Sequence, residues 1–232
     1  MARIHIVTEG ATEENFVKDV LAPYLSGKSV YADAHSITTR RDKRRNKIYR
    51  GGLDTLDHLI KDVRLWLAQE QHNADCWVTT MVDLYAFPYQ DREQWIAGFE
   101  SKNSGLEKAL FLERQLHAEF QNIPCLIPYI QLHEYEALLL VNPDVIHNAF
   151  ADHYSINTLN RLKQNIGASL PEEINQGQHT APSKRIIQHY PEYGDSKPVW
   201  GSLIAKEIRI EAMRKACPHF NEWLTKLETL NK

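Results

Sequence analysis

The sequence has few of the features that mark secreted, membrane-spanning or disulfide-bonded chains. Its 232 residues include only 3 cysteines, widely spaced and odd in number, which argues against a disulfide framework. No CxxC pair occurs, so a structural zinc site is not expected from the spacing. The longest apolar stretch, residues 137–141, is far too short to span a bilayer. The opening residues lack the pattern of a secretory signal, so we expect a cytoplasmic protein without a membrane partner.

Nucleotide-binding motifs are missing as well. The sequence contains neither GxxxxGK[ST] nor GxGxxG, so it predicts no ATP or dinucleotide site. A net charge of −3 gives no overall attraction to nucleic acid, while 43% hydrophobic and 25% charged residues are ordinary for a globular fold. No linker rich in Gly, Ser or Pro divides the chain cleanly. We expect an α/β domain over residues 1–142 and a helical extension over 143–232, which can belong to the same compact unit.

Short apolar runs alternate with segments of helical periodicity. The runs expected to form strands are residues 3–9, 29–38, 76–83 and 125–132. The segments expected to form helices are residues 12–25, with Thr12 as N-cap, and residues 53–67, 91–121 and 134–140. Strands that alternate with helices predict an α/β fold with a mainly parallel sheet flanked by helices, and the remaining residues predict further helices.

Acidic residues follow three of the expected strands. Glu9 comes after the first strand, Asp83 ends the strand at 76–83, and Glu134 and Glu136 follow the strand at 125–132. The carboxyl ends of parallel strands meet at one edge of a sheet, where functional groups collect. Clustered carboxylates repel one another without a cation, and their oxygens suit Mg²⁺ or Mn²⁺. Each acid alone has a plainer explanation as a cap or a turn residue, but together they predict a metal site.

The neighbours of these acids leave alternatives open. Residues two apart on a helix point about 200° apart, so only one of Glu134 and Glu136 is expected to face a metal. Glu134 is nearer the strand end and is favoured as the ligand, which leaves Glu136 in a supporting role. Glu13 is either a ligand or part of a helix cap. His133 is either a general base or simply a hydrogen-bonded side chain.

A basic segment, which we expect to form a loop, lies between residues 40 and 50. Seven of its residues are basic and one is acidic, which gives a local charge of +6 in a chain that is acidic overall. Such a segment predicts binding of a polyanion such as nucleic acid, although charge runs are often merely solvated. The candidate nucleic-acid-binding residues are Arg40, Arg41, Lys43, Arg44, Arg45, Lys47 and Arg50.

Ser183 and Lys184 suggest two chemistries. Lys184 is favoured as a catalytic group that stabilises the developing charge of a phosphoryl transition state. Alternatively, Ser183 and Lys184 form a nucleophile and base in a hydrolase whose activity would survive EDTA.

Several motifs carry a resemblance to a known family. They are IVTEGATE at 6–13, VDLYAFP at 82–88, LHEYEALL at 132–139 and APSKR at 181–185, with a looser match at 208–209 and 214–224. In this order they resemble the Toprim-like bacterial family called domain of unknown function 4276. The resemblance implies a Toprim-like fold in which Glu9 is the first-strand glutamate and Asp83 the first residue of an Asp-x-Asp pair, both used with Mg²⁺. The second aspartate position is Tyr85, which removes one ligand.

The resemblance also implies a function and a partner. Toprim folds act with Mg²⁺ in topoisomerases, primases and nucleases, and members of this family often accompany an ABC-type ATPase in mobile or antiphage loci. We therefore expect a Mg²⁺-dependent nuclease of DNA or RNA with catalytic residues Glu134 and Lys184. The alternative is a non-catalytic subunit that binds nucleic acid or the ATPase, and Tyr85 favours it. The oligomeric state is left open, and a homo-oligomer is compatible with the sequence.

Overall fold

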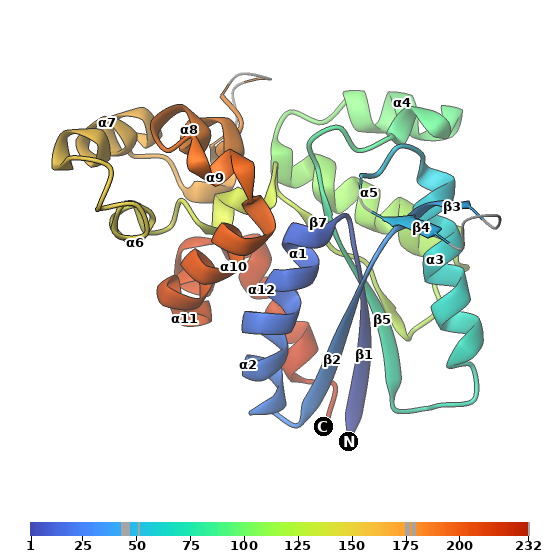
Figure 1. Cartoon of the computed structure of the whole chain (residues 1–232). Coiled ribbons are helices and arrows are strands. Elements are labelled where there is room, and N and C mark those ends of the chain that lie inside the picture. The colour runs from blue at the N-terminus through green and yellow to red at the C-terminus, as the bar shows by residue number, and fades with distance from the viewer. Residues whose placement is uncertain (43–46, 51, 175–176, 178–179, 232) are drawn as a thin grey trace.

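The protein is described by a computed structural model that covers residues 1–42, 47–50, 52–174, 177 and 180–231 (Figure 1). Its centre is a sheet with the order β2-β1-β5-β6, and β7 also pairs with β5. All of these pairings are parallel. The strands are β1 (Ala2–Thr8), β2 (Val30–Ser36), β5 (Cys76–Asp83), β6 (Leu126–Ile127) and β7 (Ile130–Gln131). The expected α/β fold with a mainly parallel sheet is confirmed.

The strand expected at 125–132 is two short strands instead of one. Pro128 lies between them and has no N–H to donate to the sheet. Beside Pro128, the Thr80 hydroxyl of β5 connects this segment to the sheet. It donates to the Tyr129 carbonyl at 2.8 Å and accepts from the Tyr129 N–H at 2.9 Å. The chain therefore stays beside β5 and reaches its carboxyl end.

One face of the sheet is covered by the first helix. This helix runs through α1 (Ala11–Phe16), a π-helical stretch (Val17–Leu21) and α2 (Ala22–Ser26). The expectation that Thr12 is its N-cap is wrong, because the extended residue before the helix is Gly10 and Thr12 already lies in the first turn. Ile4 and Ile6 of β1 belong to the hydrophobic cluster of this face.

The opposite face is covered by α3 (Leu56–Gln69), α4 (Glu93–Glu100) and α5 (Gly105–Glu119). The single helix expected at 91–121 is broken, because the Ser104 hydroxyl accepts a hydrogen bond from the Glu107 N–H at 3.1 Å and begins a new helix. Val7 of β1 packs into the cluster of this second face.

The basic segment forms part of a two-stranded ribbon beside α3 rather than the expected loop (Figure 1). Strands β3 (Thr38–Asp42) and β4 (Lys47–Arg50) pair antiparallel. Arg40, Arg41, Lys47 and Arg50 lie on these strands, whereas the predicted residues Lys43, Arg44 and Arg45 lie outside the described residues.

The C-terminal part is helical, as expected, and packs on the α1 side of the sheet (Figure 1). Its elements are a 3₁₀ helix (Tyr135–Leu138), α6 (Pro143–Asn148), α7 (Ile156–Ile166), a second 3₁₀ helix (Pro171–Glu173), α8 (Pro182–His189), α9 (Glu192–Asp195), α10 (Lys197–Ile208), α11 (Ile210–Ala216) and α12 (Pro218–Glu228). One hydrophobic cluster reaches from Ile4 of β1 to Leu227 of α12, so the sheet and these helices share a core.

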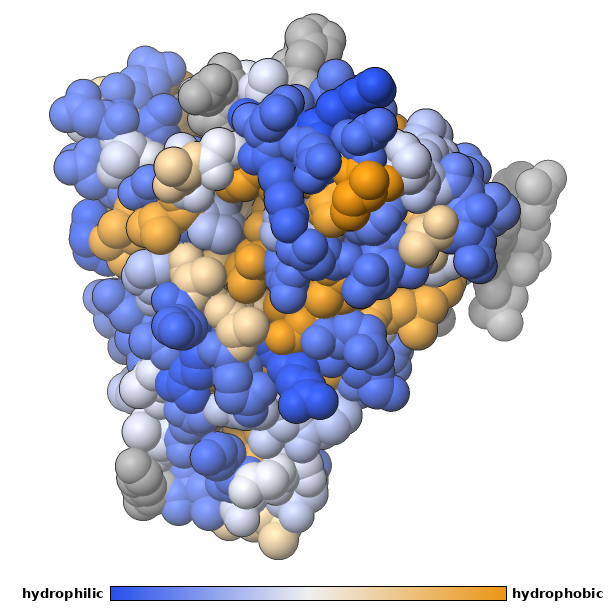
Figure 2. Space-filling model, turned by 90° about the vertical axis from the view of Figure 1, so that its left-hand side faces the viewer, coloured by the Kyte–Doolittle hydropathy of each residue, from blue (hydrophilic) through white to orange (hydrophobic). Residues whose placement is uncertain are grey.

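The outer face of the helical part mixes hydrophilic side chains with apolar patches (Figure 2). The large exposed apolar residues of the helical part, within the described chain, are Ile156 on α7, Leu170, and Val199 and Leu203 on α10. None of the described helices is both long enough and apolar enough to cross a lipid bilayer.

Candidate functional site

Three acids lie together beyond the carboxyl ends of the parallel strands. Glu9 directly follows β1, Asp83 is the last residue of β5, and Glu134 follows the end of β7 after two intervening residues, Leu132 and His133. Pairing continues past the strands, because the Tyr85 N–H donates to the His133 carbonyl at 2.8 Å. His133 has a φ of 63°, and this left-handed residue turns the chain so that Glu134 comes back toward β5.

Hydrogen bonds connect these acids in series. The Asp83 N–H donates to Glu9 Oε2 at 3.1 Å, and the Tyr135 N–H donates to Asp83 Oδ1 at 2.9 Å. Glu134 immediately precedes Tyr135, so these two backbone hydrogen bonds connect the chain segments that carry the three acids. The grouping at one edge of the sheet follows from this framework, as the sequence predicted it would from strand order alone.

Glu134 is fixed by a helix that is distant in sequence. Its backbone is extended, with φ −141° and ψ 157°, so it precedes the 3₁₀ helix and does not share that helix with Glu136. Glu134 Oε2 accepts the Ser183 N–H of the first turn of α8 at 2.8 Å, a position that favours a negative charge. The buried Ser183 hydroxyl has no hydrogen-bond partner among the described residues.

Glu136 is buried behind this edge and forms the pair that sequence reasoning missed. Its Oε1 lies 3.2 Å from Lys197 Nζ and accepts a hydrogen bond from the Tyr193 hydroxyl at 3.1 Å. Burial raises the pKa of Glu136, although the lysine opposes that shift. Burial also acts to lower the pKa of Lys197, but the charges of Glu136, Glu134 and Asp83 outweigh it and raise that pKa. Lys197 is therefore the cation of the acidic cluster.

Glu13 completes the cluster from the first turn of α1. Its Oε2 accepts the Gly10 N–H at 2.8 Å, so it caps the helix that follows Glu9. Burial, together with the charges of Glu9 and Glu136, raises its pKa to about 8. Glu13 thus caps the helix and, with its raised pKa, holds a proton near pH 7.

The electrostatics of this acidic site disfavour several unpaired negative charges. We define the site as Glu9, Glu13, Asp83, Glu134 and Glu136 with Lys197. Burial first, and then repulsion between the carboxylates, raises the pKa of Asp83 well above its usual range, and burial also raises the pKa of Glu9. Such carboxylates bind either a proton or a cation, and hard oxygen ligands suit Mg²⁺ or Mn²⁺.

The spacing limits how many acids one cation can reach. Among the described residues, no three of these carboxylates each place an oxygen within 4.8 Å of the other two. Mg²⁺ commonly takes only one or two protein carboxylates and completes its shell with water and phosphate oxygens. Glu9 and Asp83 are joined directly, since the Asp83 N–H donates to Glu9 Oε2.

His133 and Tyr85 line a cavity next to the acidic site. The cavity has a volume of about 520 Å³, and Lys108 and Gly105 also border it. Burial lowers the pKa of His133 to about 4, so this imidazole is neutral near pH 7. Gly105 is needed here, because a Cβ at that position would lie 2.9 Å from His133 Cε1.

Lys184 lies in the first turn of α8, directly after Ser183. Its side chain is exposed, and no described residue forms an ion pair with it, whereas Ser183 beside it is buried. A Ser183–Lys184 nucleophile and base would need both groups in one shared pocket, so the geometry does not favour that hydrolase. The lysine that lies beside the acids is Lys197, 3.2 Å from Glu136, instead of Lys184. No local motif in the sequence marks Lys197.

The stability of the metal-free protein should fall as the pH rises. Between 4.5 and about 8 the folded protein keeps a proton on Glu13 that the unfolded chain has lost, so this contribution is full below pH 4.5 and is lost as the pH rises through about 8. For one such group, the free energy of unfolding decreases by up to about 1.4 kcal/mol per pH unit. Thermal unfolding across this range should show a decreasing melting temperature that Glu13→Gln makes less steep. A melting temperature that increases with pH in the same way in both proteins would contradict the assignment.

Comparison with known proteins gives one match. The model of a family described as "Domain of unknown function (DUF4276)" matches residues 8–228. No curated protein and no solved structure matches the chain. The matched range includes every residue of the acidic site.

Proposed function

This chain belongs to the domain of unknown function 4276 family, and we propose that it is a Mg²⁺- or Mn²⁺-dependent nuclease that cleaves phosphodiester bonds in DNA or RNA. The observation that carries the proposal is the grouping of Glu9, Asp83 and Glu134 at the carboxyl edge of a parallel sheet, with Lys197 as their cation. Buried acids of this kind are costly without a function that uses them.

The fold relationship is part of the proposal. A glutamate directly after β1 and an aspartate at the end of the neighbouring strand β5 are the arrangement that a Toprim-like domain requires. The parallel register of these two strands, in which Thr8 is opposite Met81, supports it. Tyr85 occupies the second aspartate position, and Glu134 supplies a carboxylate at the same edge instead.

The residues have separate tasks in the proposed reaction. Glu9 and Asp83 would hold the cation, which when bound supplies Lewis acidity to a phosphate oxygen. Glu134 stays fixed by the Ser183 N–H, and Lys197 offsets part of the negative charge that phosphate and carboxylates bring together. His133 is neutral near pH 7 and borders the adjoining cavity, so it is available to accept a proton from water there.

A direct assay tests the proposal. Purified protein is incubated with single-stranded and double-stranded DNA and RNA, with Mg²⁺ or Mn²⁺ and with EDTA. We expect cleavage that requires the cation and disappears with EDTA. Cleavage that continues in EDTA would contradict the metal-dependent reaction and would support a metal-independent hydrolase.

A second candidate function is a non-catalytic subunit that binds nucleic acid or an ABC-type ATPase partner. The observation that favours it is Tyr85, which replaces a carboxylate and lines the cavity beside the site. In this alternative the acidic site is a remnant that holds a cation or protons without cleavage.

The basic segment distinguishes the two candidates through the salt dependence of binding. If its arginines contact phosphates, the log–log slope of duplex binding against salt should change by about 0.9 per contact. Arg44→Ala with Arg45→Ala should therefore reduce the slope by up to about two, without changing Mg²⁺ binding. A reduced slope with cation-dependent cleavage supports the nuclease, and a reduced slope without cleavage supports the binding subunit. An unchanged slope would show that these two arginines do not contact the phosphates.

A further inference from the structure

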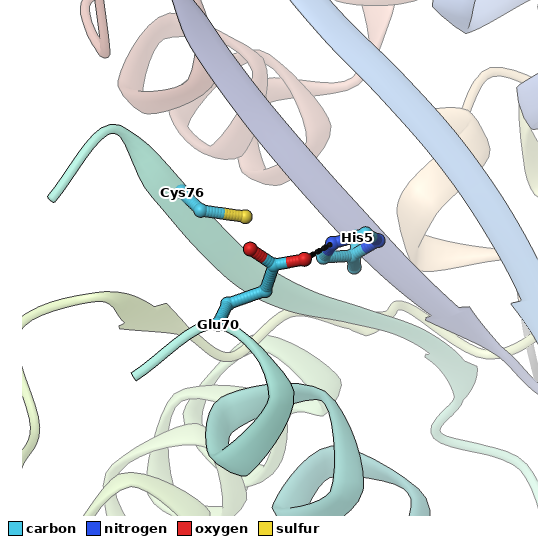
Figure 3. A group of neighbouring side chains, drawn as sticks. All are labelled: His5, Glu70 and Cys76. Atoms are coloured by element: carbon cyan, nitrogen blue, oxygen red, sulfur yellow. Dashed lines mark hydrogen bonds and ion pairs between the residues drawn. The ribbon is translucent and has the colours of Figure 1, made fainter. Parts of the chain in front are cut away.

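A second group of ligating side chains lies on the α3 side of the sheet, away from the acidic site. His5 of β1, Glu70 directly after α3 and Cys76 at the start of β5 each place one ligand atom within 4.8 Å of the other two. Figure 3 shows that the Glu70 carboxylate lies between the other two side chains and that Cys76 points toward it. His5 and Cys76 are each 3% exposed. Because His5 precedes Glu9 by four residues, this group lies about 13 Å along the strand from the acidic edge.

The hydrogen-bond partners of His5 suit a cation beside its ring. Its Nδ1 lies 2.7 Å from Asp33 Oδ1, and its Nε2 lies 3.1 Å from Glu70 Oε1. A neutral imidazole has one N–H donor, so it cannot donate to two carboxylates. Either a second proton or a metal cation must stand between His5 and one of the two acids. A metal on Nε2 would leave Nδ1–H to donate to Asp33, which is the usual carboxylate–histidine–metal arrangement.

Glu70 is held in position for such a role. Its Oε2 accepts a hydrogen bond from Asn73 Nδ2 at 2.6 Å and from the Arg3 guanidinium at 3.2 Å. These partners orient the carboxylate and leave Oε1 facing His5 Nε2. Ligating carboxylates in metal sites are commonly hydrogen-bonded in this way.

We propose that His5 Nε2, Glu70 Oε1 and Cys76 Sγ form a binding site for a divalent transition-metal cation of the Zn²⁺ class. A nitrogen, a sulfur and an oxygen ligand suit Zn²⁺, whereas Mg²⁺ requires oxygen ligands, so this site differs in chemistry from the acidic site. The cation joins β1, β5 and the end of α3, and it leaves one tetrahedral position for water. Spacing along the sequence did not indicate the site, because its ligands come from three separate elements.

A neighbouring arrangement competes with this one. Asp33 and His35 also place ligand atoms within 4.8 Å of one atom of His5. Their side chains are 49% and 34% exposed, and neither offers a thiolate. The buried side with Cys76 is the better Zn²⁺ site, because a thiolate binds Zn²⁺ strongly and water competes less there.

Cobalt substitution tests the site without reference to activity. Tag-free, metal-free protein is titrated with Co²⁺ and followed by absorption, and the cobalt is then displaced by Zn²⁺. We expect one equivalent to bind with a thiolate-to-cobalt charge-transfer band. Cys76→Ser should remove that band and weaken Zn²⁺ binding at least about 10-fold, since it removes a direct ligand. Cys125→Ser is the matched control, because Cys125 lies outside the group, and it should change neither.

Further variants identify which side of His5 binds the metal. Asp33→Asn should weaken Zn²⁺ binding about 10-fold through the orientation of His5, and His35→Gln should leave it unchanged. Glu70→Gln serves as the second ligand variant if Cys76→Ser does not fold by circular dichroism. Absence of the charge-transfer band in the native protein would overturn the site. A loss of binding in His35→Gln but not in Cys76→Ser would overturn the proposed ligand set.

Discussion

Asp83→Asn is expected to reduce Mg²⁺-dependent cleavage by at least about 100-fold while the protein stays folded. Asparagine keeps the oxygen that accepts the Tyr135 N–H at 2.9 Å, so the backbone framework of the site is preserved. It removes the negative charge that would hold the cation together with Glu9. Loss of a direct ligand should exceed the 10- to 100-fold effects seen when only the hydrogen-bond partner of a ligand is removed.

Although Asp83→Asn should reduce cleavage, it should increase the stability of the metal-free protein. Burial and the neighbouring carboxylates already disfavour the charge on Asp83, so removing it should raise the melting temperature of the metal-free protein near pH 8. Mg²⁺ should stabilise the native protein and no longer stabilise the variant. Asp144→Asn, a matched change at an exposed residue of α6, should alter neither activity nor metal response. Equal cleavage rates for Asp83→Asn and the native protein at limiting Mg²⁺ would remove Asp83 from the site.

Lys197→Met is expected to have the largest effect on stability. The change leaves the Glu136 carboxylate, 5% exposed, without its cation. Breaking a buried pair from one side costs about 3–5 kcal/mol, and the 33% exposure of the Lys197 side chain favours the lower end of that range. Denaturant unfolding should show this loss in the free energy of unfolding. It is best measured near pH 8, because Glu136 is then less able to take up a compensating proton.

A double variant separates lost charge pairing from lost packing. Glu136→Gln combined with Lys197→Met should recover most of the stability, because no unpaired charge is then buried. Lys163→Met is the matched control, since the Lys163–Asp144 pair at 2.7 Å is exposed on both sides and should contribute no more than about 1 kcal/mol. If Lys163→Met and Lys197→Met destabilise the protein equally, the buried pair does not have the role described here.

The carboxyl edge of the sheet was predictable because strand order alone determines where its acids lie. Glu9, Asp83 and Glu134 each follow a run whose apolar character already indicates a buried strand, and parallel strands bring their carboxyl ends together. Lys197 was not predictable in this way. It begins a helix more than 60 residues beyond Glu134, and the packing of α10 against α1 and Tyr135 brings it to Glu136.

Local structure departed from expectation where tertiary contacts compete with periodicity. Thr12 has the side chain of an N-cap, but the Gly10 N–H and the Glu13 carboxylate form the cap two residues earlier. The run at 125–132 has strand composition throughout, yet Pro128 divides it and Thr80 bridges the gap. His133 has no sequence signal for its left-handed backbone, which the cavity beside Gly105 accommodates.

Anomalous diffraction from crystals soaked in Mn²⁺ tests the central proposal most directly. We expect a peak at the carboxyl edge of the sheet, at a ligand distance of about 2.1 Å from one oxygen of Glu9 and one of Asp83. The same soak of Asp83→Asn crystals should show no peak there. Native crystals that bind Mn²⁺ elsewhere and show no density between Glu9 and Asp83 would contradict the metal site on which the proposed nuclease depends.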